Sequence, residues 1–202
     1  MVRKATPFVF SALRLCQSQC RFTYELTVGH SIADLVILRA PAAGLWPAAP
    51  LSIVECAVLS SLRRLGEADL GSIADAVSMR ADAVRRILLG RLSTWLLVRE
   101  GKDVFRTRPS WVARSEIIAV EGKLTRWREA LDQAATYRRY ADRVFVLLPA
   151  KSAEVAAEHK DFFVSEGVGL LSYDAGGVCR MLPCKKVTEH TWHREFAISR
   201  LR

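Results

Sequence analysis

A glutamate and a lysine end a strongly apolar segment just before a helical pattern begins. Residues 117–120 are apolar and lead into Glu121, Gly122 and Lys123. Such a run before a helix indicates a buried strand, and because side chains alternate along a strand, Glu121 and Lys123 lie on one face. Two charges at the end of a buried strand are costly unless they are paired or bind a ligand. The motif therefore predicts a site, with a simple salt bridge as the alternative interpretation.

A second acid, Asp34, interrupts another apolar strand, predicted over residues 31–38 after an alternating strand over 22–28 and a Gly29-His30 turn. A lone carboxylate in such a strand needs a partner. Asp34 and Glu121 together could hold a hard cation, Mg²⁺ or Mn²⁺, with water and phosphate oxygens completing the shell. Lys123 could then orient or deprotonate a water molecule, or stabilise developing charge.

Strands and helices alternate around these residues. A first helix is expected over residues 3–20. The later patterns predict helices over 124–140 and 152–167, and strands over 144–149, 168–173 and 178–182. This alternation implies an α/β fold whose parallel or mixed sheet is covered on both faces. On the helix over 124–140, Gln133 and Tyr137 share one face with Arg126, which lies roughly opposite the apolar stripe of Leu124 and Leu131.

A separate module is expected between the two acidic strands. Residues 41–50 contain three prolines and a glycine, which indicates a linker. Ser52 and Glu55 then form a capping box that begins a helix ending near residue 65. The patterns after it predict a short helix from Asp69 or Ser72 through Val77, a helix over 80–92, and a β-hairpin over 96–106. Three helices and a hairpin in this order resemble a winged helix-turn-helix module, assigned to residues 51–110.

Charge and composition point to a polyanionic partner. The 202 residues carry a net charge of +9. Basic residues on or beside the third helix, on the wing and on the later helix are candidates for phosphate contacts. They are Arg80, Arg85, Arg86, Arg91, Arg99, Lys102 and Arg126. Winged helices also serve as protein-interaction or dimerisation modules, so a homodimer or a protein partner through this module stays open as an alternative.

The remaining composition favours a cytoplasmic protein that does not span a membrane. The chain has no run of eighteen apolar residues. Arg14 interrupts the early apolar segment and no small-residue cleavage site follows, which argues against export. The five cysteines are an odd number without a CxxC pair, so reduced thiols are expected and a zinc site is not.

Taken together, Asp34, Glu121, Gly122 and Lys123 resemble the PD-(D/E)xK nuclease superfamily, which places an acid on one strand and acid-x-lysine on the next. The spacing of Gln133 and Tyr137 resembles the QxxxY motif of its RecB-like branch, and the segments over 141–149 and 167–171 have the texture of bacterial members. The resemblance implies a restriction-endonuclease-like mixed sheet flanked by helices, formed by residues 1–40 and 115–202 around the inserted module. It also implies that the Gly122 carbonyl joins Asp34 and Glu121 as a metal ligand, and that Gln133 and Tyr137 touch the scissile strand. Glu25 is the best candidate for the additional upstream acid of the family.

The sequence therefore predicts a Mg²⁺- or Mn²⁺-dependent nuclease in DNA repair or defence, with DNA as the favoured substrate and RNA as a further possibility. The catalytic set is Asp34, Glu121, Lys123, Gln133 and Tyr137. The competing hypothesis is a non-catalytic DNA-binding or regulatory protein that uses a nuclease-like scaffold. The intact charges of Asp34, Glu121 and Lys123 argue against that alternative, because a scaffold has no need of buried charges.

Overall fold

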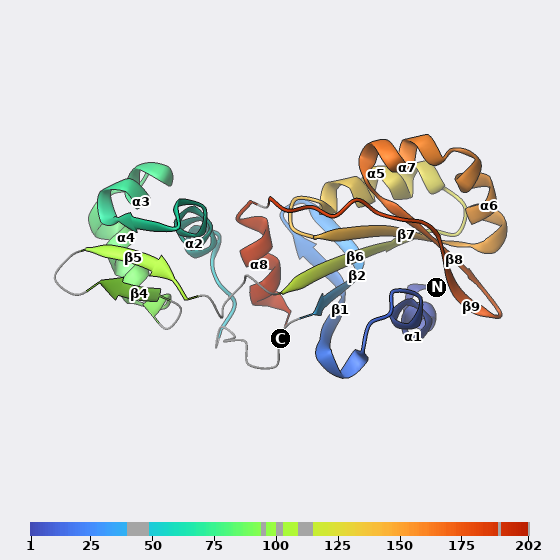
Figure 1. Ribbon diagram of the computed structural model, residues 1–202, viewed down its shortest axis with the longest axis horizontal. Helices are drawn as coiled ribbons and strands as arrows, with labels where there is room; N and C mark the ends of the chain where they lie inside the picture. The colour runs from blue at the N-terminus through green and yellow to red at the C-terminus, as the bar shows by residue number, and fades with distance from the viewer. Residues whose placement is uncertain (40–48, 94–95, 100–102, 109–114, 190, 202) are drawn as a thin grey trace. The chain divides into compact units, whose positions relative to one another are not determined.

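The protein consists of two structural units (Figure 1). The computed structural model describes residues 1–39, 49–93, 96–99, 103–108, 115–189 and 191–201. The first unit comprises Met1–Ala42 and Ser115–His190, and the second comprises Ala43–Arg114 and Thr191–Arg200. The chain thus leaves the first unit after the strand that carries Asp34 and re-enters it at the strand that carries Glu121.

A six-stranded sheet with the order β1-β2-β6-β7-β8-β9 forms the first unit. Its strands are β1 (Cys20–Val28), β2 (Ser31–Arg39), β6 (Glu116–Gly122), β7 (Arg143–Pro149), β8 (Gly169–Asp174) and β9 (Gly177–Leu182). The β1–β2, β2–β6 and β8–β9 pairs are antiparallel, whereas β6–β7 and β7–β8 are parallel. Parallel central strands need helical crossovers, which agrees with the predicted alternation. The predicted α/β class and mixed sheet are confirmed.

Helices cover both faces of this sheet (Figure 1). On one face lies α1 (Val2–Ala12), whose Val9 and Phe10 join Leu35 and Val120 in one core cluster. The short 3₁₀ turn η1 (Gln17–Gln19) follows it. On the other face lie α5 (Trp127–Tyr137), α6 (Ala150–Glu158) and α7 (Lys160–Glu166). The strands between the two layers are therefore apolar on both sides, as the sequence indicated.

Two helix boundaries in this layer differ from the prediction. α5 begins at Trp127, so Leu124 precedes the helix and is 65% exposed, not part of its apolar stripe. The single helix expected over 152–167 is two helices, because His159 leaves the helical conformation with φ −104° and ψ 33°. The His159 ring stacks on Trp127 at a centroid distance of 5.1 Å. Packing between helices, which periodicity does not reveal, decides both boundaries.

The second unit combines helices with a small sheet of order β3-β5-β4. Its elements are α2 (Ile53–Leu65), β3 (Glu67–Asp69), α3 (Leu70–Ala76), α4 (Ala81–Leu89), β4 (Leu96–Arg99), β5 (Val104–Thr107) and α8 (His193–Arg200). The predicted capping box is confirmed: Ser52 Oγ accepts from Glu55 N at 3.2 Å, and Glu55 accepts from Ser52 N at 2.7 Å. Asp69 caps α3 with its side chain alone, since its Oδ1 atom accepts from Ser72 N at 2.9 Å. β3 was not predicted, because three residues show no periodicity.

The C-terminal segment differs from the predicted division of the chain. Residues 115–202 were assigned to the nuclease-like core, whereas Thr191–Arg200 belong to the second unit. There Glu195 of α8 is fully buried and pairs with Arg63 of α2, with 2.8 Å between Oε1 and Nε. Buried charges are tolerated only with such a partner. The local sequence of the tail does not reveal that Glu195 is buried, because its partner Arg63 lies far away in the chain.

The register predicts that the first unit folds without the inserted residues. Arg39 and Glu116 are paired across the β2–β6 ladder, so the chain leaves and re-enters at neighbouring points. Replacing residues 40–115 with a short Gly/Ser hairpin linker, and ending the chain at residue 190, should leave a cooperatively unfolding unit. Circular dichroism and urea denaturation measure this. A variant without a cooperative transition would contradict the proposed independence of the first unit.

Candidate functional site

Asp34 and Glu121 are brought together by the β2–β6 pairing. Leu35 is paired with Val120, so Asp34 and Glu121 occupy the next positions along the same ladder. Residues facing each other on adjacent strands have Cβ atoms about 5 Å apart. Gly122 N also donates a hydrogen bond of 2.8 Å to Asp34 Oδ2. Two acids far apart in the sequence thus become neighbours at one end of two central strands.

Lys123 completes the arrangement on the same face. Its Nζ atom lies 3.2 Å from Glu121 Oε1. The lysine side chain is 27% exposed, whereas that of Glu121 is 4% exposed. The carboxylate is therefore inside and the ammonium group reaches the surface. A ligand would meet Lys123 and Asp34 first, since Asp34 is half-buried.

Tyr137 of α5 holds the second oxygen of Glu121. Its hydroxyl lies 2.6 Å from Glu121 Oε2 and 2.6 Å from the carbonyl oxygen of Ile32. The hydroxyl has one proton and can donate it to only one of these acceptors. Both contacts are satisfied together when Glu121 carries a proton. Tyr137 is 1% exposed, so the prediction that its helix face points away from the core is wrong for this residue. The phenol is buried because the carboxyl group satisfies its polar end.

The electrostatics of the site oppose ionisation of Glu121. Burial raises the pKa of Glu121, and the nearby Asp34 charge raises it further, while the Tyr137 hydrogen bond and Lys123 act in the opposite direction. Burial likewise raises the pKa of Tyr137, with the hydrogen bond to Glu121 as the next cause. Two carboxyl groups that share one site resist ionising together. A cation between them would relieve this repulsion.

Gly122 has a steric role that the sequence motif does not reveal. A Cβ atom at this position would collide with Cγ2 of Val2, at the start of α1, and would lie 3.3 Å from Cε of Met1. The side of β6 opposite Glu121 is therefore filled by the beginning of α1. A glycine between Glu121 and Lys123 allows this close approach.

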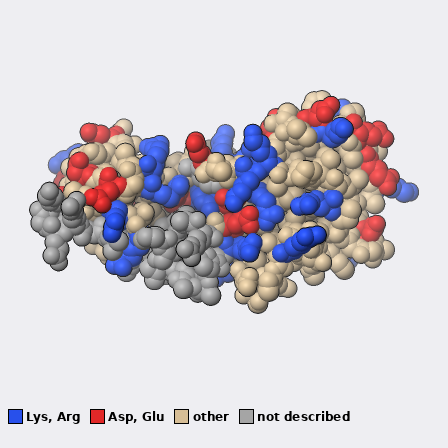
Figure 2. Space-filling view, viewed as in Figure 1, with Lys and Arg blue, Asp and Glu red and all other residues tan. Residues whose placement is uncertain are grey.

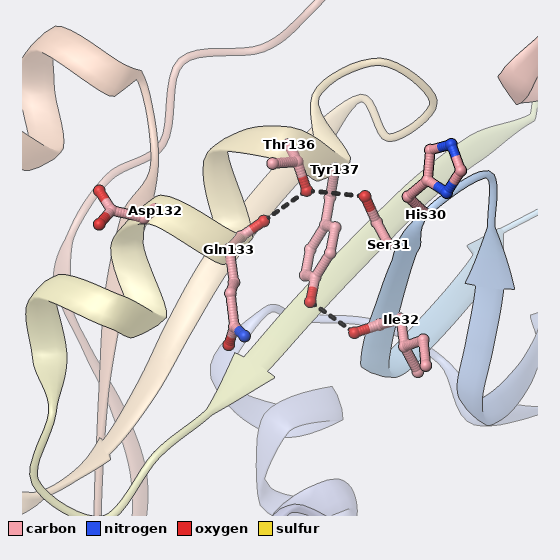
Figure 3. A pocket seen from close by; sticks show the side chains of 7 residues that line it. All are labelled: His30, Ser31, Ile32, Asp132, Gln133, Thr136 and Tyr137. Atoms are coloured by element: carbon pink, nitrogen blue, oxygen red, sulfur yellow. Dashed lines mark hydrogen bonds between the residues drawn. The ribbon is translucent and has the colours of Figure 1, made fainter.

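A pocket of about 400 Å³ is lined by Tyr137, whose hydroxyl also contacts Glu121 (Figure 3). It is formed by the β1–β2 turn, the start of β2 and α5. The lining residues are His30, Ser31, Ile32, Asp132, Gln133, Thr136 and Tyr137. The predicted Gln133 and Tyr137 are thus joined by five residues that the sequence analysis did not select. Ser31 and Thr136, whose hydroxyl oxygens are 3.0 Å apart, connect the turn to the helix. Among these five residues, only His30, Ser31 and Ile32 could have been suggested by the sequence, because they lie close to Asp34 in the chain.

Glu25 does not join the two acids in this structure. The β1–β2 ladder pairs Tyr24 with Leu35 and Leu26 with Ala33, and passes over Glu25, whose φ is +57°. The exposed side chain of Glu25 instead lies 3.5 Å from Arg3 of α1. Since α1 covers the face opposite α5, Glu25 is directed away from the site.

Four of the candidate nucleic-acid-binding arginines have an acidic neighbour that leaves them largely exposed. Arg80 and Arg86 lie near Asp82, Arg85 lies 3.1 Å from Asp103, and Arg126 lies 3.0 Å from Glu129. These arginine side chains are between 51% and 87% exposed, so such pairs exchange easily for other anions. The side chain of Arg99 and all of Lys102 lie outside the described residues.

Arg91 has a different role from the other arginines. It donates to the carbonyl oxygens of Pro50 at 2.8 Å and Ala49 at 3.3 Å, and lies 3.4 Å from Glu55. These bonds fix the chain at the start of α2. Arg91 is therefore primarily a structural residue.

Comparison with known proteins leaves the function to be argued from this geometry. No protein-family model, no curated protein and no solved structure matches the chain. Within the described residues, no helix is long and apolar enough to cross a membrane. Over the same residues, no group of three or more His, Cys, Asp and Glu side chains forms a metal site. A cation at Asp34 and Glu121 would depend on two carboxylates and on non-carboxylate oxygens.

The electrostatics predict that Glu121→Gln does not destabilise the protein at neutral pH. A carboxyl group whose pKa is raised by folding binds its proton more tightly in the folded state, so stability falls as pH rises above its unfolded pKa of about 4.3. The glutamine keeps an acceptor for Tyr137, and because it does not ionise, the fall in stability with rising pH is removed. Urea denaturation across the acidic to neutral range should show a flatter pH dependence and equal or greater stability for the variant.

Glu116→Gln is the matched control at the other end of β6. Glu116 forms two contacts with Arg143, at 3.0 and 3.1 Å, as a purely structural pair. Its replacement should cost about 1–2 kcal/mol. If Glu121→Gln cost as much at neutral pH, Glu121 would be a structural salt-bridge residue and the pH argument would fail.

Proposed function

We propose that this protein hydrolyses phosphodiester bonds of nucleic acid with Mg²⁺ or Mn²⁺, with DNA as the favoured substrate. The observation that carries the proposal is the convergence of Asp34, Glu121 and Lys123 at the end of β2 and β6. A buried acid with a raised pKa beside a second acid and a lysine is typical of functional sites. A salt bridge that served stability alone would not require Asp34.

The topology supports the resemblance to PD-(D/E)xK nucleases. The acid lies on β2, the acid-x-lysine motif on the adjacent antiparallel β6, and the helix with Gln133 and Tyr137 leads to the parallel β7. This is the order of elements that the motif requires. Within the second unit, the order α2, α3, α4 and the β4–β5 hairpin supports a winged helix-turn-helix module. The restriction-endonuclease-like fold and the inserted module are parts of this proposal.

The residues present fit a hard divalent cation. Asp34 and Glu121 repel each other's charge, which raises the pKa of Glu121 beyond the effect of burial. Mg²⁺ is commonly held by one or two carboxylates, with water and phosphate oxygens in the other positions. The Gly122 carbonyl is the further ligand that the family resemblance implies. When bound, the cation would supply a water of lowered pKa and charge neutralisation at the phosphate.

The chain's own side chains then have distinct roles. Lys123 reaches the surface from beside Glu121 and, as an ammonium group, can orient a water molecule or stabilise charge on a phosphate oxygen. It could accept the proton of that water only after losing its own proton. Tyr137 fixes Glu121 through its 2.6 Å contact, so the carboxyl group stays in place when Lys123 turns to a substrate. Gln133, which is exposed on the same helix, is available to the substrate strand.

The charge of the molecule supports a nucleic-acid substrate. With a net charge of +9, the surface has more basic than acidic groups to offer a phosphate backbone. Figure 2 shows Lys and Arg spread over the face in view, while acidic side chains gather over α6 and α7. Exposed acids there include Glu154, Glu158 and Asp161. We therefore expect the substrate to avoid the outer surface of α6 and α7.

Lys123→Ala should reduce cleavage at least about a hundredfold, because it removes a group that acts in the reaction. The test is initial-rate cleavage of labelled single-stranded, double-stranded and branched DNA, and of RNA, with and without Mg²⁺ or Mn²⁺. Asp34→Ala and Glu121→Ala should lose both cleavage and cation binding measured by calorimetry. Lys151→Ala, at an exposed lysine on α6, is the control that should keep full activity. Unimpaired cleavage by the Lys123, Asp34 or Glu121 variant would exclude the assignment.

The non-catalytic alternative is tested by the same experiment. It is favoured by one observation: both oxygens of Glu121 are already engaged, by Lys123 and Tyr137. A wild-type protein that binds DNA but cleaves none of these substrates with either cation would support the DNA-binding or regulatory hypothesis. Cleavage of RNA in preference to DNA would revise the substrate while keeping the chemistry.

The winged-helix proposal predicts specific effects of two arginines. Replacing Arg85 or Arg86 with alanine should weaken DNA binding across sequences and reduce the salt slope by about one per lost phosphate contact. Fluorescence anisotropy at several salt concentrations measures both quantities. Arg91→Ala should instead lower the thermal stability of the second unit, because it removes the bonds at the start of α2. Unchanged affinity and slope for the Arg85 and Arg86 variants would favour a protein-interaction or dimerisation role for the module.

A further inference from the structure

The pocket lined by Gln133 and Tyr137 has features of a ligand site whose occupant the proposed chemistry does not specify. It measures about 400 Å³, which is within the range of small-molecule sites. One wall is Ile32, an apolar side chain that is 56% exposed. The opposite side is formed by α5, with Gln133 and Tyr137 directed towards the strand (Figure 3). In Figure 3 the carbonyl oxygen of Ile32 points to Tyr137, and the exposed Ile32 side chain beside it leaves apolar surface for a flat ligand to cover.

The pocket is rigidly joined to the two acids. Ile32 and Asp34 are two residues apart on β2, so they lie on the same face, about 6.6 Å apart along the strand. Tyr137 connects them, because its hydroxyl contacts both the Ile32 carbonyl and Glu121 at 2.6 Å. That separation is about the distance between a phosphate and the base of the same nucleotide.

Counting protons shows what the pocket offers a ligand. Thr136 Oγ1 donates to the Gln133 carbonyl at 2.7 Å, so its single proton is used. Ser31 must therefore donate in the 3.0 Å bond to Thr136, which leaves its oxygen as an acceptor. The exposed side-chain amide of Gln133 adds donors and an acceptor at adjacent atoms. An amide of this kind matches a base edge with a neighbouring acceptor and amino group.

The lining carries no lysine or arginine to balance the charge of a phosphate. None of the seven lining residues is Lys or Arg, and one of them, Asp132, is an acid. Hydroxyl and amide side chains also contact phosphates, but the strong phosphate contacts come from cationic groups. A neutral ring with donors and acceptors fits these surroundings better than an anion does.

We propose that this pocket binds an unstacked nucleobase of the substrate strand, with its face on Ile32 and its edge on Gln133. The inference rests on the proposed function, since it places the phosphate of that nucleotide near Asp34 and Glu121. A paired and stacked base cannot enter a pocket, so the substrate is single-stranded or has an unpaired nucleotide at the site. This specifies a substrate class that the acids and the lysine alone do not.

An abasic scan of binding tests the proposal without requiring cleavage. A series of fluorescent single-stranded oligonucleotides, each with one abasic residue at a different position, is titrated with wild-type protein in Ca²⁺ buffer and followed by anisotropy. One position should lose about tenfold in affinity, the usual effect of losing one stacked base. In Ile32→Ala and Gln133→Ala, the intact strand should bind about tenfold more weakly, and the abasic residue at that position should have no further effect.

Matched controls exclude general effects of surface substitution. Val155 on α6 is 51% exposed, a fraction similar to the 56% of Ile32. Its neighbour in the sequence, Glu154, is exposed and polar. Val155→Ala and Glu154→Ala should keep the wild-type profile of the scan. The base pocket would be overturned if the wild type bound no single strand, or if its affinity were the same for every abasic position. It would also be overturned if both pocket variants kept the full loss of affinity at the sensitive position.

The two proposals fail in different ways. A protein that cleaves in the presence of Mg²⁺ but shows a uniform scan keeps the nuclease function and loses the pocket. A protein with one sensitive position, abolished by Ile32→Ala and Gln133→Ala, but without cleavage, keeps the pocket and loses the nuclease function.

Discussion

The hydrogen bond from Gly122 N to Asp34 ties together the two strands on which the site depends. It joins the last residue of β6 to the carboxylate of β2 at 2.8 Å and thereby fixes Asp34 beside Glu121. The same glycine admits the start of α1 on the opposite face, where a Cβ atom would collide with Val2. One residue therefore serves the packing of one layer and the chemistry of the other. Any larger side chain at position 122 would displace the start of α1.

Around this junction, the energetics of a buried acid determine the rest of the arrangement. Burial alone disfavours an ionised Glu121, and Asp34 adds to the effect. Tyr137 and Lys123 contact its two oxygens, at 2.6 and 3.2 Å, and keep the group in place. These contacts do not fully offset the cost of burial, since the pKa of Glu121 stays raised. A fold under selection for stability alone would replace this set with apolar residues. Its presence at the end of two central strands is the reason for the proposal that the acids bind a ligand.

Periodicity and capping signals were sufficient to predict most of the first unit and the start of the second. The strands of Asp34 and Glu121, the capping box of Ser52 and the mixed sheet follow from local pattern. Other features depend on contacts between distant residues. Tyr137 can be buried because its hydroxyl forms a hydrogen bond with Glu121. The helix α8 belongs to the second unit, where Glu195 pairs with Arg63. The pocket between a turn and a helix was equally invisible, since His30 and Thr136 meet only in the folded chain.

Diffraction from Mn²⁺-soaked crystals at the manganese absorption edge shows whether Asp34 and Glu121 form one cation site. We expect an anomalous peak between the two carboxyl groups, at metal–oxygen distances of about 2.0–2.3 Å, with the Glu121–Lys123 pair separated. The peak should vanish in Asp34→Asn. An Mn²⁺ ion bound elsewhere, or a pair of acids that stays metal-free with Lys123 still on Glu121, would contradict the account.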